Sequence, residues 1–126
     1  MAAGAVTPIK DQGQCGSCWA FSTTGSLEGA HFTKSNELLS FSEQQLVDCA
    51  GVQYGNLGCN GGLATSAYNY YMDGHYAILE SEYAYTSGSG RKGKCMYDSS
   101  PKTDVTVTSF TDVTTEDVDA MRAALA

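Results

Sequence analysis

Apolar residues recur at helical spacing in several stretches of the chain. The first stretch covers residues 17–34 and predicts one long helix, because its apolar positions return every three or four residues. Gly25 and Gly29 lie four residues apart in this stretch and would let another backbone pack closely, at a cost in helix propensity. The candidate buried positions of the helix are Trp19, Phe21, Leu27, Ala30 and Phe32.

Two shorter helices follow the first one. Ser42-Glu43-Gln44-Gln45 has the S-x-x-Q form of a capping box, so it predicts a helix through Leu46 and Val47 to about Asp48. Leu63 to Asp73 predicts the third helix. We expect this helix to end at Gly74, because glycine readily adopts the left-handed conformation that follows a helix C-cap.

The other segments are less regular. Residues 49–62 contain five glycines and predict a compact loop, and Thr86 to Lys94 is a polar stretch with little expected regular structure. Val105 to Phe110 alternates between apolar and polar residues, as a half-buried strand does. Thr115 onward predicts a final helix with three apolar residues along one face: Val118, Met121 and Leu125.

Composition narrows the class of protein. A chain of 126 residues that is 42% hydrophobic can form one modest core. Its net charge of −7 argues against nucleic acid as a partner, because phosphates need a basic surface. No apolar run approaches the roughly 20 residues that span a bilayer, so we expect no membrane partner either. The N-terminal residues do not have a signal-peptide pattern, so any targeting region is expected to lie outside this sequence.

The cysteines suggest chemistry. The chain has five, and in an oxidising compartment an odd number predicts two disulfides and one free thiol. Cys15 and Cys18 form a CxxC pair just before the single tryptophan, Trp19. A thioredoxin-type redox pair would need a preceding strand, where this chain has a glycine-rich loop. A zinc site with Cys49 and Cys59 would need a second short knuckle, but these two cysteines lie ten residues apart.

A third interpretation gives the two cysteines separate roles. Cys15 would anchor the loop through a disulfide to a later cysteine. Cys18 would lie in the first turn of a helix, where unpaired backbone N–H groups and the helix dipole stabilise a thiolate. This is the environment of a cysteine nucleophile.

The segment Gln12 to Ser22, with the sequence QGQCGSCWAFS, resembles the active-site segment of papain-like cysteine peptidases, the papain and cathepsin L group. Three further blocks agree with that family: residues 4–8 (GAVTP), residues 39–49 (LSFSEQQLVDC) and residues 58–62 (GCNGG). The resemblance covers nearly the whole chain in register. It implies a mainly α fold with irregular loops, namely the disulfide-linked helical left domain of the papain-like α+β fold, with the right-hand barrel domain absent.

The resemblance also implies roles for individual residues. Cys18 would be the nucleophile, and the Gln12 side chain would donate to the oxyanion together with the backbone N–H of Cys18. Trp19 is expected to be core packing instead. The implied disulfides are Cys15–Cys59 and Cys49–Cys95, and the implied substrate-binding positions are a backbone strip and an apolar pocket: Gly61, Gly62, Leu63 and Ala64. No cofactor or metal is implied.

The partners of such a nucleophile are expected to lie outside the sequence. The family places its histidine some 130–150 residues beyond the cysteine, whereas 108 residues follow Cys18. His31 would lie about 20 Å from Cys18 along the same helix, and His75 follows a helix end, so neither is a credible base. We therefore expect residues 1–104 to be the left domain and residues 105–126 to be the start of the right domain, disordered or exchanged between chains.

The function expected from the resemblance is that of a cysteine endopeptidase fragment that is inactive alone. Its parent would be secreted, lysosomal or vacuolar and would act on peptides or proteins. The missing right domain or a second copy of the chain are further expected partners. An alternative is a non-catalytic half-enzyme that binds peptides, inhibitors or a complementary fragment, or that serves as a folding model.

Overall fold

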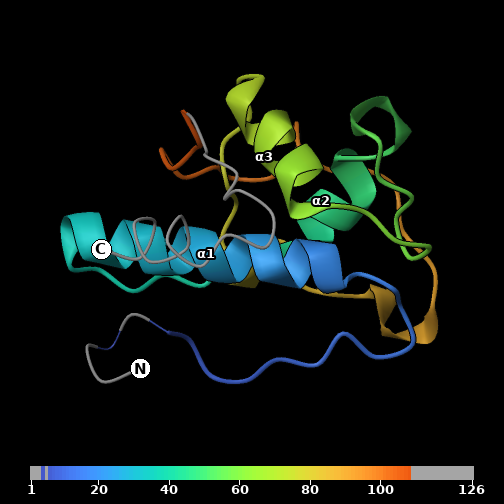
Figure 1. Cartoon of the computed structure of the whole chain (residues 1–126), viewed down its shortest axis with the longest axis horizontal. Helices are drawn as coiled ribbons and strands as arrows, with labels where there is room; N and C mark the ends of the chain where they lie inside the picture. Colours follow the sequence, from blue (N-terminus) through green and yellow to red (C-terminus); the bar gives the residue numbers. More distant parts are fainter. Residues whose placement is uncertain (1–3, 5, 109–126) are drawn as a thin grey trace, which may run out of the picture.

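The computed structural model describes residue 4 and residues 6–108, and three α-helices organise them (Figure 1). These helices are α1 (Cys18–Ser35), α2 (Glu43–Cys49) and α3 (Ala64–Met72). Three short 3₁₀ helices lie in the loops: η1 (Val52–Tyr54), η2 (Glu80–Glu82) and η3 (Ser87–Ser89). Within the described ranges there is no strand longer than an isolated bridge, and such bridges pair Gly16 with Asn60 and Phe41 with Leu79.

Helix α1 confirms the predicted long helix. It ends where Asn36 takes the left-handed conformation and donates its backbone N–H to the Phe32 carbonyl. Its buried face differs from the expected one, because Ala30 is exposed and Phe21 and Phe32 are only half-buried. The buried positions instead include three polar residues with hydrogen-bond partners from the chain: Thr23, Thr24 and Glu28.

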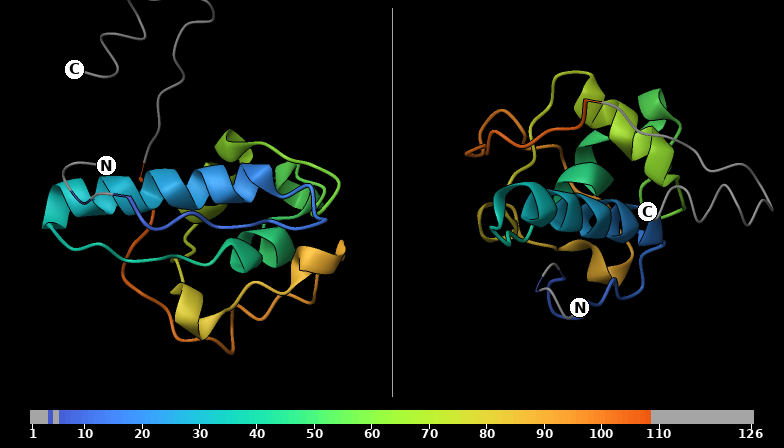
Figure 2. Two further views of the ribbon diagram at one scale, coloured as in Figure 1. Left: turned by 90° about the horizontal axis from the view of Figure 1, so that it is seen from below. Right: turned by 60° about the vertical axis from the view of Figure 1, so that its left-hand side comes forward.

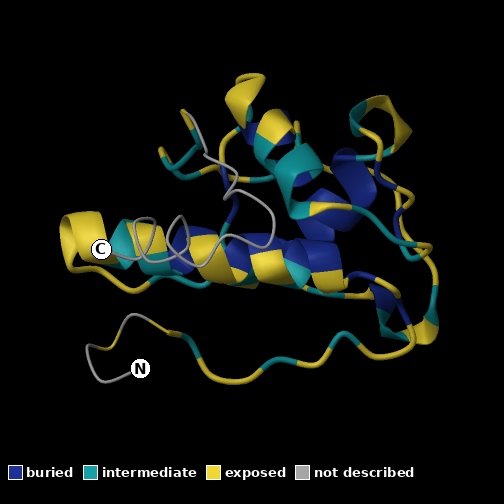
Figure 3. Ribbon diagram, viewed as in Figure 1, coloured by how far each residue is buried: buried dark blue, intermediate teal, exposed yellow. Residues whose placement is uncertain are grey.

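Helix α2 is buried along its whole length (Figure 3). Its N-terminus has half of the predicted capping box, since the Ser42 hydroxyl accepts a hydrogen bond from the backbone N–H of Gln45. The Gln45 side chain bonds instead to the backbone of residues 76 and 78, with distances of 2.8 and 2.9 Å. Distant loops therefore hold α2, which explains why such a polar helix lies in the interior.

Helix α3 confirms the third predicted helix, and Gly74 follows its C-cap with a φ of +97°. Helices α2 and α3 both pack against α1, as the two views of Figure 2 show. The core contains residues from every helix and from the loops between them: Trp19, Ala20, Leu27, Phe41, Leu46, Val47, Cys49, Ala50, Ala67, Tyr70, Tyr71 and Ala77.

The strand predicted from Val105 is wrong over residues 105–108, which are irregular. The Val105 carbonyl accepts a hydrogen bond from the Ala77 backbone, and the Thr106 hydroxyl donates to the carbonyls of Tyr71 and His75. These partners belong to α3 and the loop after it, so residues 105–108 have no strand to pair with among the described residues. Val105 and Val107 pack against the core. Phe110 and the helix predicted from Thr115 lie outside the described residues, and the domain boundary at residue 104 stays a prediction.

Among the described residues, no helix has the length and apolar character that crossing a membrane requires.

Candidate active site

Cys18 is the first residue of α1, and it is exposed. All five cysteines are described, and the other four form the disulfides Cys15–Cys59 and Cys49–Cys95, which are the pairs that the resemblance implies. The side chain of the N-cap residue, Ser17, makes no capping hydrogen bond to α1. The first N–H groups of a helix have no partner within it, so this end can donate to an anion beside Cys18.

The loop before Cys18 is held on two sides. The Cys15–Cys59 disulfide and a hydrogen bond of 2.8 Å from the Gly16 N–H to the Cys59 carbonyl fix it to the loop before α3. On the other side, the Gln14 N–H donates to the Gly88 carbonyl in η3, also at 2.8 Å. Gly13 has a φ of +66°, and a Cβ there would lie 2.7 Å from the Gly88 oxygen, so this close approach requires glycine.

Gln12 lies half-buried at the start of this loop. Its side-chain Nε2 donates to the Cys15 carbonyl at 2.7 Å. An amide nitrogen carries two hydrogens, so a second donor remains on the same side chain. Gln12 is therefore tied to the loop of the nucleophile and retains a donor for a ligand.

The four substrate-binding residues expected from the sequence lie between the Cys59 disulfide and α3. Gly61 has a φ of +116°, and its carbonyl accepts from the Leu57 N–H. A Cβ on Gly62 would lie 2.8 Å from the Trp19 ring, so the strip packs directly against α1. Leu63 is 63% exposed, and Ala64 begins α3.

Two buried residues support this strip. The Trp19 ring nitrogen donates to the Gly58 carbonyl at 3.1 Å, and Trp19 is buried in the core as expected. Asn56 is fully buried and accepts from the Leu63 N–H while donating to the Ala50 carbonyl. The sequence analysis missed Asn56, because its partners lie in different elements and no motif marks it.

Neither histidine has contacts near Cys18. His31 lies 3.2 Å from a carboxylate oxygen of Glu37, at the far end of α1. His75 donates its Nδ1 hydrogen to the Tyr70 carbonyl and stacks on the Tyr70 ring, with centroids 4.1 Å apart. The hydrogen bonds and ring contacts of both histidines are therefore away from the nucleophile loop.

Lys10, two residues before Gln12 in the sequence, is the centre of a buried ionic cluster. Lys10 Nζ is 3.0 Å from Glu28 and 2.7 Å from Glu43, whose side chains are 2% and 1% exposed, and 3.9 Å from Glu80. Burial favours the neutral amine, but hydrogen bonds to the two closest carboxylates raise the Lys10 pKa. The cluster fixes the N-terminal segment to α1 and α2, and sequence reasoning missed it.

Glu43 and Glu80 also shift the pKa of each other. Burial, followed by the interaction with the Glu43 side chain and its charge, raises the pKa of Glu80 to about 8. Burial opposes ionisation of Glu43 too, but the interactions with Glu80, Lys10 and Thr24 lower its pKa. Glu43 Oε1 and Glu80 Oε1 are both buried without a hydrogen-bond partner among the described residues, so we expect a single proton between the two carboxyl groups to satisfy both.

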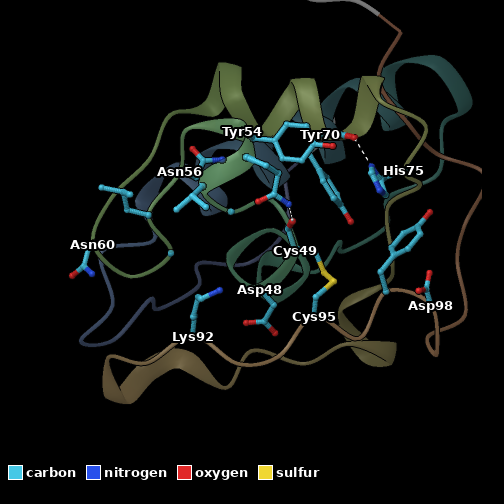
Figure 4. A pocket seen from close by; sticks show the side chains of 16 residues that line it. Asp48, Cys49, Tyr54, Asn56, Asn60, Tyr70, His75, Lys92, Cys95 and Asp98 are labelled. Atoms are coloured by element: carbon cyan, nitrogen blue, oxygen red, sulfur yellow. Dashed lines mark hydrogen bonds between the residues drawn. A yellow bond between two sulfur atoms is a disulfide. The ribbon is translucent and has the colours of Figure 1, made fainter.

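One cavity lies away from Cys18. It measures about 620 Å³ and lies beside the Cys49–Cys95 disulfide, with the rings of Tyr54 and Tyr70 and the side chain of His75 in its wall (Figure 4). Asp48 also lines it, but its carboxylate already accepts hydrogen bonds from Gln44, Tyr83 and the Gly93 backbone. Neither Gln12 nor Cys18 contributes to this cavity, so its volume says nothing about chemistry at the thiol.

Comparison with known proteins agrees with the geometry. A family model described as "Papain family cysteine protease" matches residues 1–126. Cysteine proteinase 15A of Pisum sativum is 52% identical over 120 residues, which are 90% of this chain and 32% of the pea protein. Cathepsin L of Sarcophaga peregrina is 47% identical over 123 residues, 98% of this chain and 35% of the fly protein. The chain thus spans about a third of the length of these curated relatives.

A solved structure shows the same fold. The chain superposes on a Carica candamarcensis cysteine protease in complex with E-64 with a TM-score of 0.86 and 32% sequence identity. The match covers 98% of this chain and 55% of the plant chain. The plant protease therefore continues well beyond the part to which this chain corresponds.

Proposed function

The chain belongs to the papain family of cysteine proteases, and from that premise we propose that it carries the nucleophile half of a peptidase active site. One observation carries this proposal: the only unpaired cysteine, Cys18, is exposed at the N-terminus of α1, while Cys15 fixes the adjoining loop. Cys18 would be the nucleophile, and Gln12 would be a donor to the oxyanion.

In the proposed reaction, the Cys18 sulfur attacks the carbonyl carbon of a peptide bond and forms a tetrahedral intermediate. The electron pair of the carbonyl moves onto its oxygen. The Cys18 backbone N–H and the second Nε2 hydrogen of Gln12 stabilise this negative charge, and each such donor contributes about 3 kcal/mol to lowering the barrier. The intermediate then collapses to a thioester on Cys18 as the C–N bond of the peptide breaks, and the amine takes up a proton from a general acid as it leaves.

The substrate would bind in an extended conformation along Gly61 and Gly62. Gly61 has open space where a Cβ would stand, so a peptide backbone can approach it closely. The exposed Leu63 side chain and the neighbouring Ala64 provide apolar surface for a substrate side chain. Peptides and proteins are thus the proposed substrates of the whole protein.

We propose that this chain does not turn over peptides by itself. The leaving amine needs a proton donor, and the contacts of His31 and His75 are away from the thiol.

A complementary right domain is the favoured partner, because Ile9 is fully exposed and Val6 is 56% exposed beside α1. A half-enzyme that only binds peptides remains the second candidate, supported by the same intact strip. The two disulfides fit an oxidising compartment, so we place the parent protein in a secreted, lysosomal or vacuolar setting.

The test compares two electrophiles on the folded, oxidised chain. A peptidyl vinyl sulfone with an apolar side chain on the second residue before the electrophile should label Cys18 faster than methyl vinyl sulfone, relative to their rates with free cysteine. Intact mass and peptide mapping locate the label, and Cys18→Ser serves as the blank. If the peptidyl reagent shows no rate advantage, the proposed substrate binding along Gly61 and Gly62 is refuted. Peptide cleavage by the pure chain, lost in Cys18→Ser, would show that it is active alone.

A further inference from the structure

Tyr85 connects two parts of the candidate site. Its hydroxyl lies 2.6 Å from the Gln12 carbonyl and 2.9 Å from the Ser17 hydroxyl, although these residues are 73 and 68 positions away in the sequence. In Figure 1 the segment that contains η3, just after Tyr85, lies beside the loop that leads into α1. One phenol thus joins the residue of the proposed oxyanion donor to the residue before Cys18.

The direction of these hydrogen bonds follows from counting hydrogens. The Gln12 carbonyl can only accept, so Tyr85 donates its single hydroxyl hydrogen there. Ser17 must then donate its own hydrogen to the Tyr85 oxygen. Ser17 occupies the N-cap position of α1, where serine usually accepts from an N–H of the first turn, and here it makes no such bond. Tyr85 therefore holds the Ser17 hydroxyl in a hydrogen bond outside the helix terminus.

Tyr85 is itself firmly held. The buried side-chain oxygen of Gln44 accepts from the N–H groups of the next two residues, Thr86 and Ser87, at 2.7 and 3.0 Å. The Tyr85 ring makes an edge-to-face contact with Phe21 of α1, with centroids 5.1 Å apart. The phenol is thus fixed from α2 on one side and from α1 on the other, which is what a group that positions others requires.

We propose that Tyr85 is a positioning residue for the oxyanion site. It fixes the backbone of Gln12, so that the side-chain amide stays where it can donate, and it keeps Ser17 from competing for the N–H groups at the start of α1. The proposal rests on the proposed roles of Cys18 and Gln12. Tyr85 would touch neither substrate nor thiol.

The test uses a reversible adduct in which an oxygen occupies the oxyanion position. The probe is N-acetylaminoacetaldehyde with ¹³C at the aldehyde carbon. The Cys18 sulfur bonds to this carbon, the carbonyl π bond breaks, and the thiol proton ends on the oxygen, which gives a hemithioacetal without any other reactant. The ¹³C spectrum of the full 126-residue chain gives the equilibrium constant for the adduct, with Cys18→Ser as the blank.

Four variants separate positioning from a general loss of structure. Gln12→Ala and Tyr85→Phe should each lower the adduct constant about fivefold, the size of one ordinary hydrogen bond. In the double variant, Tyr85→Phe should add little to Gln12→Ala, because residues that act through one another are not additive. Tyr76→Phe is the matched control. Tyr76 is partly exposed and takes no part in the hydrogen bonds to Gln12 and Ser17, so this variant should leave the adduct constant unchanged.

The outcomes distinguish the two proposals. If Gln12→Ala has no effect, or the wild-type chain forms no adduct, the proposed function loses its oxyanion site and the role of Tyr85 falls with it. If Gln12→Ala weakens the adduct but Tyr85→Phe does not, only the role of Tyr85 is overturned, and full additivity of the two effects overturns it too. Should Tyr85→Phe not fold, Phe21→Leu removes the ring contact that holds the phenol in place. That variant should also weaken the adduct, and a constant equal to that of the wild type would count against the proposal.

Discussion

Replacing Glu80 by glutamine tests the proton shared with Glu43. The pKa of Glu80 rises from its ordinary 4.5 to about 8 in the folded chain, so the folded state binds more protons than the unfolded state between these two values. The stabilisation is fully present below about pH 4.5 and is lost as the pH rises through about 8. Glutamine keeps a neutral hydrogen-bonding group at all pH values. The Glu80→Gln variant should therefore not lose this part of its stability.

The expected magnitude follows from the shift. A complete shift from 4.5 to about 8 corresponds to about 5 kcal/mol at 1.36 kcal/mol per pKa unit. The Glu80 side chain is 28% exposed, so water screens its interaction with Glu43 and we expect about 2 kcal/mol of this value to appear. Between pH 5 and pH 8.5 the unfolding free energy of the wild type should fall by about 2 kcal/mol relative to that of Glu80→Gln.

The assay is urea unfolding at several pH values, followed by the fluorescence of the buried Trp19. All chains carry Cys18→Ser, which prevents exchange between the free thiol and the disulfides at alkaline pH. Glu82→Gln is the matched control, because it makes the same substitution at an exposed residue of the same 3₁₀ helix. Parallel pH curves for Glu80→Gln and its parent would refute the shared proton.

Three further predictions concern stability, and the first two are measured by urea unfolding. Lys10→Met should destabilise the chain by about 3–5 kcal/mol, because two buried carboxylates lose their counter-charge; a loss no larger than that of the exposed control Lys34→Met would be contrary evidence. Gly62→Ala should cost about 1–3 kcal/mol through contact with Trp19, whereas Gly25→Ala, with open space around it, should not destabilise; equal effects would contradict the packing described. Each disulfide spans about 45 residues and contributes about 4 kcal/mol, so the reduced chain should unfold under mild conditions, and persistence of sharp near-UV circular dichroism would argue otherwise.

Local signals made the three helices predictable from the sequence. Each signal depends only on neighbouring residues: the N-cap at Ser42, the helix end at Gly74 and the helical spacing after Ser17. The structure confirms all three helices. The buried polar face of α1 was not predictable in this way. Glu28 is buried because Lys10 and the Phe41 N–H bind it, and these partners lie 18 and 13 residues away.

The residues of the candidate site also differ in whether local sequence or distant contacts identify them. Cys18 and Gln12 stand in a short motif, so their proposed roles came from the sequence. Tyr85 and Gln44 act through hydrogen bonds to residues more than 40 positions away, and only the folded chain brings them to the loop of the nucleophile. The strand predicted from Val105 failed over the described residues, since its alternation reflects packing on α3 instead of pairing with a strand.

The central claim is that Cys18 is a nucleophile held in a formed half-site. Acylation by the p-nitrophenyl ester of an N-acyl amino acid tests it most directly, because this leaving group needs no proton donor. The Cys18 sulfur forms a thioester as the C–O bond breaks, and one equivalent of p-nitrophenolate per chain should appear in a single fast phase, followed by slow deacylation. Intact mass should show one acyl group, mapped to Cys18. Release no greater than that from Cys18→Ser, or an acyl group on another residue, would contradict the claim.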